Sequence, residues 1–287
     1  MKFGIMFANA GPFARPELAV ELAHLAEELG FESLWTVEHT VVPTGYASAY
    51  PYSPDGRMPG NEEAEIPDPL IWLSYVAAVT TRLRLATGIL ILPQRNPVTL
   101  AKELATLDVM SHGRVELGIG VGWLREEFDA LGVPFNERGA RTDDYVAALR
   151  TLWGPGDDTY RGRFVEFEHA NSYPKPPQPG GIPIVIGGHT EPAARRAGRL
   201  GDGFFPGVYR AEELRPLLDV MAGAARDTGR DPAAIEITAG GALDHDGVAR
   251  LGDLGVSRLV IPPLGFDLEK LERRMGRFAD EVIAKLG

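Results

Sequence analysis

Short apolar runs and amphipathic stretches alternate along the chain. Residues 83–92 form a nearly unbroken apolar run rich in branched side chains, which is typical of a parallel strand buried on both faces. Leucines then recur at helical spacing from 100 to 107, behind Asn96 and Pro97, two residue types that favour a helix start. A second apolar run follows at 115–119. The pattern predicts two parallel strands joined by a crossover helix.

The same alternation continues through the rest of the chain. The apolar runs predict strands at 2–8, 33–37, 83–92, 115–119, 182–186, 203–205, 235–239 and 257–261. Amphipathic patterns predict helices that include 16–30, 69–81, 142–153, 211–228, 248–254 and 268–286. This repeated alternation predicts an α/β fold, a closed (β/α)8 TIM barrel formed by 1–287 as a single domain. A doubly wound open sheet is the competing fold.

Three long irregular segments interrupt the alternation. They follow the second strand, at 43–67, and the fourth, at 122–141, and precede the fifth, at 154–181, where a short hairpin is expected at 158–167. Loops of this length inside a compact domain are usually functional. Catalytic groups of a barrel lie at the carboxyl ends of its strands, so we expect these insertions to wall an active site there.

Composition and charge exclude several functions. The formal charge of −11 argues against a nucleic-acid partner, which would need a basic face. No apolar run reaches the roughly 20 residues that cross a bilayer, and the chain begins with a strand pattern rather than a signal peptide. We therefore expect a cytoplasmic protein with no membrane partner. The chain has no cysteine, and its histidines show no metal-ligand spacing, so no metal site is expected.

Glu38 and His39 lie at the carboxyl end of the second predicted strand. Adjacent side chains of a strand point to opposite faces, so only one of the two faces the barrel mouth if the strand continues through both. His39 is the better candidate for proton transfer near neutral pH. The alternative is structural, with Glu38 in a salt bridge and His39 capping a loop.

Glycine-rich turns follow the fourth and fifth strands. The turn Gly187-Gly188-His189-Thr190 precedes a helix, where backbone N–H groups and the helix dipole attract a phosphate. The alternative is an ordinary turn with Thr190 as the helix N-cap. The glycines at 118–122 alone indicate only a tight turn. Trp123, directly after them, either lines a pocket or packs in a core.

Together these segments resemble the luciferase-like flavin and deazaflavin oxidoreductases, and they are most similar to the branch that uses coenzyme F420. The resemblance rests on SLWTVEHT at 33–40, TTRLRLATGILILPQRNPVTLAKELATLD at 80–108, GRVELGIGVGWLREEFDALGVPF at 113–135 and YPKPPQPGGIPIVIGGHTEPAARRAGRLGDGFFP at 173–206. These stretches span most of the first two-thirds of the chain, and they are specific only in combination. The last third resembles a generic barrel ending.

The resemblance implies a barrel, usually a homodimer, with a flavin-like cofactor across the strand ends. Glu38 would border the deazaflavin ring, and His39 the reacting centre. A bulge in the third strand, often a non-prolyl cis peptide behind the ring, maps onto Thr87-Gly88. Sugar-phosphate-oxidising relatives have a Glu near Trp123, so Trp123 suggests a more apolar substrate pocket. The remaining cofactor contacts map onto Gly120, Val121, Gly122, Gly187, Gly188, His189 and Thr190.

The resemblance leaves more than one function open. The first is a coenzyme F420-dependent oxidoreductase that transfers a hydride between the deazaflavin C5 and a small, fairly apolar organic substrate. His39 would exchange the accompanying proton, and Glu38 would orient the ring or the imidazole. The alternative is an FMN-dependent luciferase-like monooxygenase, and the second alternative is a non-catalytic flavin- or deazaflavin-binding protein. A metal-dependent hydrolase ranks last, because no ligand set is visible.

Overall fold

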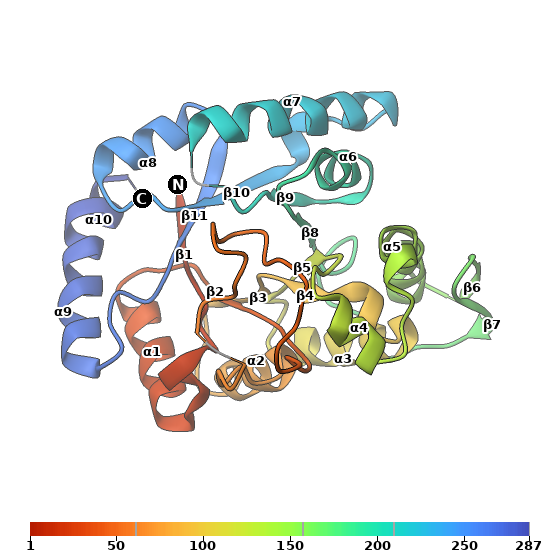
Figure 1. The fold of residues 1–287 in the computed structure, drawn as a ribbon, viewed down its shortest axis with the longest axis horizontal. Helices are drawn as coiled ribbons and strands as arrows, with labels where there is room; N and C mark the ends of the chain where they lie inside the picture. Colours follow the sequence, from red (N-terminus) through yellow and green to blue (C-terminus); the bar gives the residue numbers. More distant parts are fainter. Residues whose placement is uncertain (61, 157, 209, 287) are drawn as a thin grey trace.

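The computed structural model describes residues 1–60, 62–156, 158–208 and 210–286. Its centre is a closed barrel of parallel strands (Figure 1), in the order β1-β2-β3-β5-β8-β9-β10-β11, with β11 pairing back to β1. This closure confirms the predicted (β/α)8 barrel and excludes the open sheet. The strands are β1 (Lys2–Met6), β2 (Ser33–Thr36), β3 (Arg84–Thr87), β4 (Leu90–Ile91), β5 (Val115–Gly120), β8 (Ile184–Gly187), β9 (Gly203–Phe205), β10 (Glu236–Gly240) and β11 (Val256–Ile261).

Helices surround the barrel (Figure 1). They are α1 (Pro16–Glu28), α2 (Pro69–Ala77), α3 (Pro97–Met110), α4 (Arg125–Ala130), α5 (Arg138–Trp153), α6 (Glu191–Leu200), α7 (Ala211–Asp227), α8 (His245–Gly252), α9 (Leu268–Phe278) and α10 (Ala284–Leu286). Asn96 caps α3 as predicted, accepting hydrogen bonds from the N–H groups of Val98 and Thr99. In the described part of the chain, no helix is long and apolar enough to cross a membrane.

The third predicted strand, 83–92, is broken in two. β3 pairs with β2 and β5, whereas β4 pairs with β5 alone. The peptide bond between Gly88 and Ile89 is cis, one residue later than the position Thr87-Gly88 that the resemblance implied. Thr87 still pairs with Thr36 in the regular ladder, so the irregular backbone begins only after it.

Apolar side chains fill the space on both sides of the strands. A large cluster joins strand residues to the surrounding helices. The alternate strand positions form a smaller cluster inside the barrel, where the rings of Trp35 and Phe205 meet edge to face at 5.7 Å. Every residue of β5 is buried, which explains the continuous apolar run in its sequence.

The insertion before the fifth barrel strand carries the predicted hairpin. Its strands are β6 (Asp158–Arg161) and β7 (Glu166–Ala170), which pair antiparallel. The Tyr160 hydroxyl donates a hydrogen bond to Asp144 Oδ1 of α5 at 2.6 Å. In Figure 1 the hairpin extends outward beside α5. This insertion therefore packs on an outer helix, and we do not place it in the site described below.

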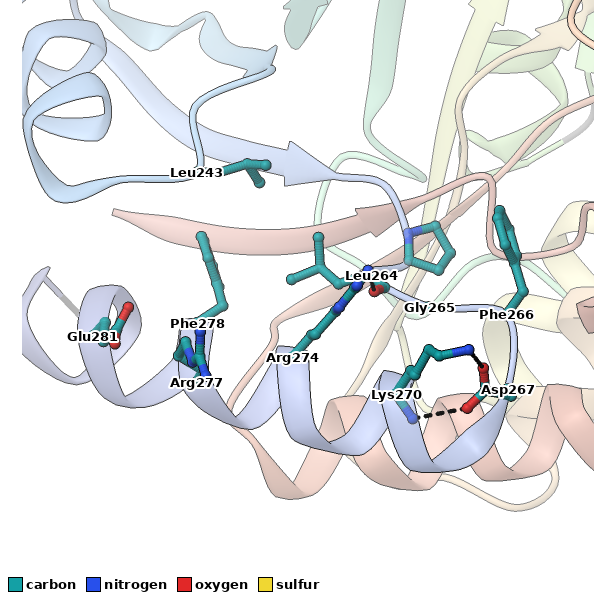
Figure 2. A pocket seen from close by; sticks show the side chains of 11 residues that line it. Leu243, Leu264, Gly265, Phe266, Asp267, Lys270, Arg274, Arg277, Phe278 and Glu281 are labelled. Atoms are coloured by element: carbon teal, nitrogen blue, oxygen red, sulfur yellow. Dashed lines mark hydrogen bonds and ion pairs between the residues drawn. The ribbon is translucent and has the colours of Figure 1, made fainter.

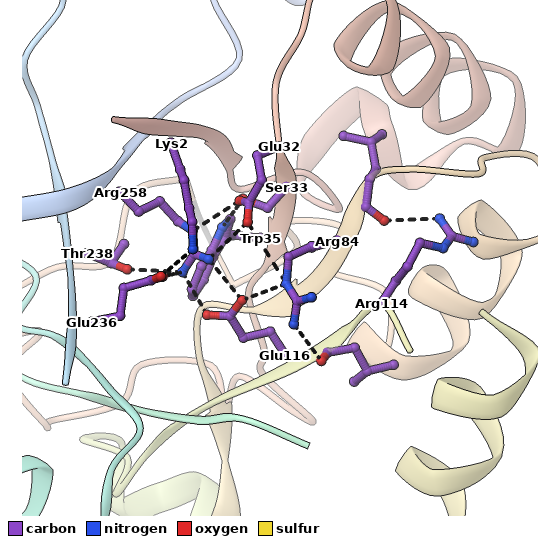
Figure 3. A network of polar contacts seen from close by, with 12 residues as sticks. Lys2, Glu32, Ser33, Trp35, Arg84, Arg114, Glu116, Glu236, Thr238 and Arg258 are labelled. Atoms are coloured by element: carbon purple, nitrogen blue, oxygen red, sulfur yellow. Dashed lines mark hydrogen bonds and ion pairs between the residues drawn. The ribbon is translucent and has the colours of Figure 1, made fainter. Parts of the chain in front are cut away.

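Charged side chains fill the amino end of the barrel (Figure 3). Arg258 of β11 is 1% exposed and forms ion pairs with Glu32, Glu116 and Glu236, which we call the amino-end cluster. The guanidinium also lies 5.3 Å from the ring centre of Trp35. Burial acts to lower the pKa of Arg258, but the carboxylates of Glu116 and Glu32 raise it above its ordinary value. Arg84 and Lys2 pair with Glu116 and Glu236 as well, so three cations lie among the three carboxylates.

Candidate active site

The imidazole of His39 lies just after β2 and is held by a glutamate of α4. Its Nδ1 is 3.1 Å from Glu127 Oε2. The other oxygen of Glu127 accepts hydrogen bonds from the backbone N–H groups of Thr40 at 2.6 Å and Val41 at 3.3 Å. The carboxylate fixes the orientation of the ring and favours the tautomer with Nδ1 protonated. Nε2 has no hydrogen-bond partner among the described residues, so it is the nitrogen available for proton exchange.

Glu38 was expected to orient either the cofactor ring or this imidazole, and its hydrogen bonds in the described part of the chain go to other groups. Its carboxylate is buried and accepts hydrogen bonds from the backbone N–H of Ile91 and from Arg95, which also binds Asp68 at 2.6 Å. Burial raises the pKa of Glu38, and Arg95 opposes that rise. Both residues lie beyond the end of β2, and Glu38 binds the backbone beside the cis peptide while His39 binds Glu127 of α4.

Glu127 is the residue that sequence reasoning missed. The pair Glu126-Glu127 reads as two ordinary acidic residues at a helix start, where the helix dipole favours them. The two glutamates differ in the face of the helix on which they lie. Leu124 and Phe128 flank Glu127 on the buried side of α4, and all three are fully buried. A carboxylate on the apolar face of a helix needs a partner, and here His39 provides it.

The bulge between β3 and β4 packs closely against glycines of the neighbouring strands. A Cβ on Gly120 or on Gly187 would overlap the side chain of Ile89, and a Cβ on Gly118 would overlap the carbonyl oxygen of Thr87. The Thr87 hydroxyl donates to the Gly118 carbonyl at 2.6 Å. These glycines therefore let the irregular backbone and the Ile89 side chain lie against the neighbouring strands.

The turn after β5 places the next two predicted residues beside the bulge. Val121 directly follows Gly120 and is half-buried. Gly122 has a φ of +79°, and a Cβ there would lie 2.8 Å from Ile91 Cγ2. Both the backbone conformation and the close packing of this turn therefore require glycine at 122.

The turn Gly187–Thr190 has the features of an anion site. Gly188 has a φ of +124°, and its N–H is already bonded to the Phe205 carbonyl at 3.1 Å. Thr190 is the N-cap residue of α6, as the alternative expected, but its side chain makes no capping hydrogen bond. The buried Nδ1 of His189 has no partner among the described residues. The uncapped N-terminus of α6 and this orphan nitrogen both fit an oxyanion.

Aromatic side chains connect the two halves of the site. Trp123 lies edge to face with His39 at 5.7 Å and with Tyr50 at 5.2 Å. Tyr50 meets Tyr52 at 5.5 Å, and Tyr52 meets His189 at 4.9 Å. The two tyrosines belong to the insertion after β2, whose orange trace lies in front of the ring of strands in Figure 1. Trp123 thus lies between His39 and the two tyrosines of the insertion.

Helix α4 also holds this insertion in place. Glu126 Oε1 accepts hydrogen bonds from the backbone N–H groups of Ala47 at 2.7 Å and Ser48 at 3.1 Å, and Oε2 accepts one from the Ser48 hydroxyl at 2.7 Å. These contacts, the Ser48 hydroxyl first, lower the pKa of Glu126 to about 2. The two glutamates of α4 therefore anchor the chain after β2 at two points. No group of acidic residues and histidines suited to a metal occurs among the residues described.

Comparisons with known proteins match most of the chain. A family model described as luciferase-like monooxygenase matches residues 1–243. A protein of Mycobacterium tuberculosis is 34% identical over 264 residues, which are 91% of each chain. An F420-dependent glucose-6-phosphate dehydrogenase of Kineococcus radiotolerans is 32% identical over 240 residues, which are 80% of this chain and 65% of the other.

A solved structure shares the whole fold. The crystal structure of monooxygenase RslO1 from Streptomyces bottropensis superposes with a TM-score of 0.78 at 26% identity, and the alignment covers 100% of both chains. The family match covers the strands and turns that build the site around His39 and Gly187–Thr190. The chain therefore belongs to the luciferase-like monooxygenase family.

Proposed function

We propose that this protein is a coenzyme F420-dependent oxidoreductase that transfers a hydride between the deazaflavin C5 and a small, fairly apolar organic substrate. The observation that carries the proposal is the His39–Glu127 pair, a histidine oriented by a buried carboxylate beside Trp123 at the strand ends. The F420-dependent relative supports the choice of cofactor. The aromatic surroundings support an apolar substrate.

The described residues fit a flavin-like cofactor. The Gly187–Thr190 turn, with the uncapped α6 and the orphan His189 Nδ1, suits its phosphate. The bulge at Gly88–Ile89 offers backbone and an apolar side chain to one face of a ring. The residues that we propose to hold the cofactor are Glu38, Thr87, Gly88, Gly120, Val121, Gly122, Gly187, Gly188, His189 and Thr190.

Each residue of the pair has a defined task in this proposal. When bound, the deazaflavin supplies the carbon that gives or takes the hydride. His39 Nε2 exchanges the proton that accompanies this transfer, and Glu127 holds Nδ1 so that the ring keeps its orientation. Glu38 acts as a positioning residue, because its carboxylate binds the N–H of Ile91 beside the bulge. Trp123 and the tyrosines of the insertion exclude water.

The proposal is tested by following the oxidation state of F420 spectroscopically with a panel of small apolar alcohols, ketones and enones. Replacing His39 by Ala should lower turnover about 10²–10⁴-fold, because general acid–base catalysis is lost, and leave F420 affinity unchanged. His24→Ala is the matched control, since His24 of α1 bonds only the Val79 carbonyl among the described residues. Near-normal turnover by the His39 variant would refute the assigned role.

An FMN-dependent monooxygenase is the second candidate. The observation that favours it is the likeness to monooxygenase RslO1, which covers both chains completely. It predicts tight FMN binding and oxygen consumption by the reduced protein with an apolar substrate. A non-catalytic flavin- or deazaflavin-binding protein predicts tight binding of the cofactor without turnover of any panel member.

We also propose that the protein is a homodimer, with α2 and α3 at the interface. Ile71 and Tyr75 of α2 and Met110 of α3 are 73%, 48% and 74% exposed, and the two helices contact each other. Large apolar side chains on adjacent helices indicate an association surface. Light scattering of the Ile71→Glu variant should show a smaller mass than the wild type. Leu268→Glu, at another exposed apolar position, should not change the mass.

A further inference from the structure

A groove of about 780 Å³ runs along α9, outside the site described above (Figure 2). This volume is in the range of small-molecule sites, roughly 300–1,000 Å³. Its lining shares no residue with the His39 site. Figure 2 shows Lys270, Arg274 and Arg277 spaced along the helix, with Leu243 opposite them on the loop after β10.

Three cations line this groove in a chain whose formal charge is −11. Lys270 is paired with Asp267 at 2.9 Å, and Arg274 donates a hydrogen bond to the Leu264 carbonyl at 3.1 Å. Arg277 has no hydrogen bond or ion pair with any residue in the described ranges. Asp267 and Glu281 also line the groove, but no ion pair joins either of them to Arg274 or Arg277 among the described residues. Two guanidinium groups one turn apart are thus left to attract an anion.

The groove also exposes large apolar side chains. Phe266 is 72% exposed and Leu243 is 50% exposed, and both line the cavity. Covering such side chains with a ligand is favourable, because apolar surface is removed from water. The family match ends at residue 243, so the groove is built almost entirely from chain beyond that match. Charge and apolar surface therefore meet in one cavity that the family match does not account for.

We infer that the α9 groove binds an amphipathic organic carboxylate. The apolar body of the ligand lies against Leu243 and Phe266, and its carboxylate binds Arg274 and Arg277. A neutral ligand leaves the guanidinium groups without an anion, and a small inorganic anion leaves the apolar rim exposed. The two requirements together select an acid with an aromatic or branched aliphatic body.

Calorimetric titration of the cofactor-free protein with 2-naphthoate and with the neutral 2-naphthamide tests this inference. Naphthoate should bind at one saturable site, and naphthamide about tenfold or more weakly, because the charge-assisted hydrogen bonds are absent. The double variant Arg274→Gln/Arg277→Gln should lose naphthoate affinity by a similar factor. Arg273→Gln is the matched control, since Arg273 lies on the same helix, pairs with Glu269 and does not line the groove.

Unchanged naphthoate binding by the double variant would overturn the inference, because the ligand would then lie elsewhere, for instance in the His39 site. Absence of saturable binding by the wild type would overturn it as well. If the double variant melts at a lower temperature, the naphthoate affinity of the single variant Arg277→Gln replaces it as the test. This substitution removes no hydrogen bond or ion pair with any described residue. The result does not depend on F420 binding, so the groove and the proposed function can fail separately.

Discussion

At the amino end of the barrel, a buried arginine is surrounded by three glutamates, whereas at the carboxyl end two buried glutamates bind backbone N–H groups, an arginine and a histidine. In the amino-end cluster Arg258 pairs with all three glutamates, and Arg84 and Lys2 supply further positive charge to Glu116 and Glu236. At the carboxyl end, Glu127 leaves one nitrogen of His39 without a partner among the described residues. Buried charge at the amino end is therefore bound by other side chains, whereas at the carboxyl end it leaves one imidazole nitrogen without a partner in the described part of the chain.

The difference shows which buried ionic groups are candidates for chemistry. Arg258 is more buried than His39, but its guanidinium is bound by three carboxylates and lies 5.3 Å from the ring centre of Trp35. His39 is hydrogen-bonded through Nδ1 to Glu127, and its ring meets Trp123 edge to face. Burial alone therefore does not make a residue a candidate for catalysis, whereas an oriented group with a free atom is one.

The largest expected effect is on stability at the amino end. Replacing Arg258 by Met should lower the free energy of unfolding by about 3–5 kcal/mol, because three carboxylates lose their buried counter-charge. Urea unfolding followed by circular dichroism measures this loss. Arg84→Met is the control, since Arg84 is 25% exposed and leaves the Arg258 pairs intact, and it should cost about 1 kcal/mol or less. Equal costs for both variants would contradict the distinct role of Arg258.

The second effect is on turnover at the carboxyl end. Glu127→Gln should lower turnover about 10²-fold, because the amide no longer selects one imidazole tautomer. Nitrogen NMR of the imidazole should show Nδ1 protonated in the wild type and a mixture of tautomers in the variant. Glu126→Gln, one residue away on the same helix, should leave the tautomer unchanged. A wild-type imidazole with Nε2 protonated would contradict the geometry.

The smallest effect is the pH dependence of the contacts between Glu126 and the insertion after β2. The pKa of Glu126 is lowered to about 2 from an ordinary 4.5, so its ionised form stabilises the folded loop. That contribution is complete above pH 4.5 and is lost as the pH falls towards about 2. Hydrogen-exchange protection of Ala47 and Ser48 should follow this course, and Glu126→Gln should lower it at neutral pH. Identical protection in the variant and the wild type would contradict the role of Glu126 in holding Ala47 and Ser48.

Most of the barrel could be predicted from sequence, because two-sided burial makes each parallel strand a visible apolar run. Within the candidate site, the sequence indicated only the residues that could be selected by their position at the end of a predicted strand. These are His39 and the turn Gly187–Thr190. The partner of His39 could not be predicted. Choosing Glu127 over Glu126 requires knowing which face of the short helix α4 is buried. The amino-end cluster was out of reach for a related reason. Its charges come from separate strands, and only the register of the closed barrel brings them together.

The measurement that tests the central claim most directly is a pair of fluorescence titrations of the purified cofactor-free protein, one with F420 and one with FMN. The account predicts saturable, tight F420 binding and much weaker FMN binding. Variants that place a side chain at Gly188, where the φ is +124°, should weaken the F420 curve. Tight FMN binding with weak F420 binding would contradict the proposed cofactor, and absence of binding to both would contradict the proposed site.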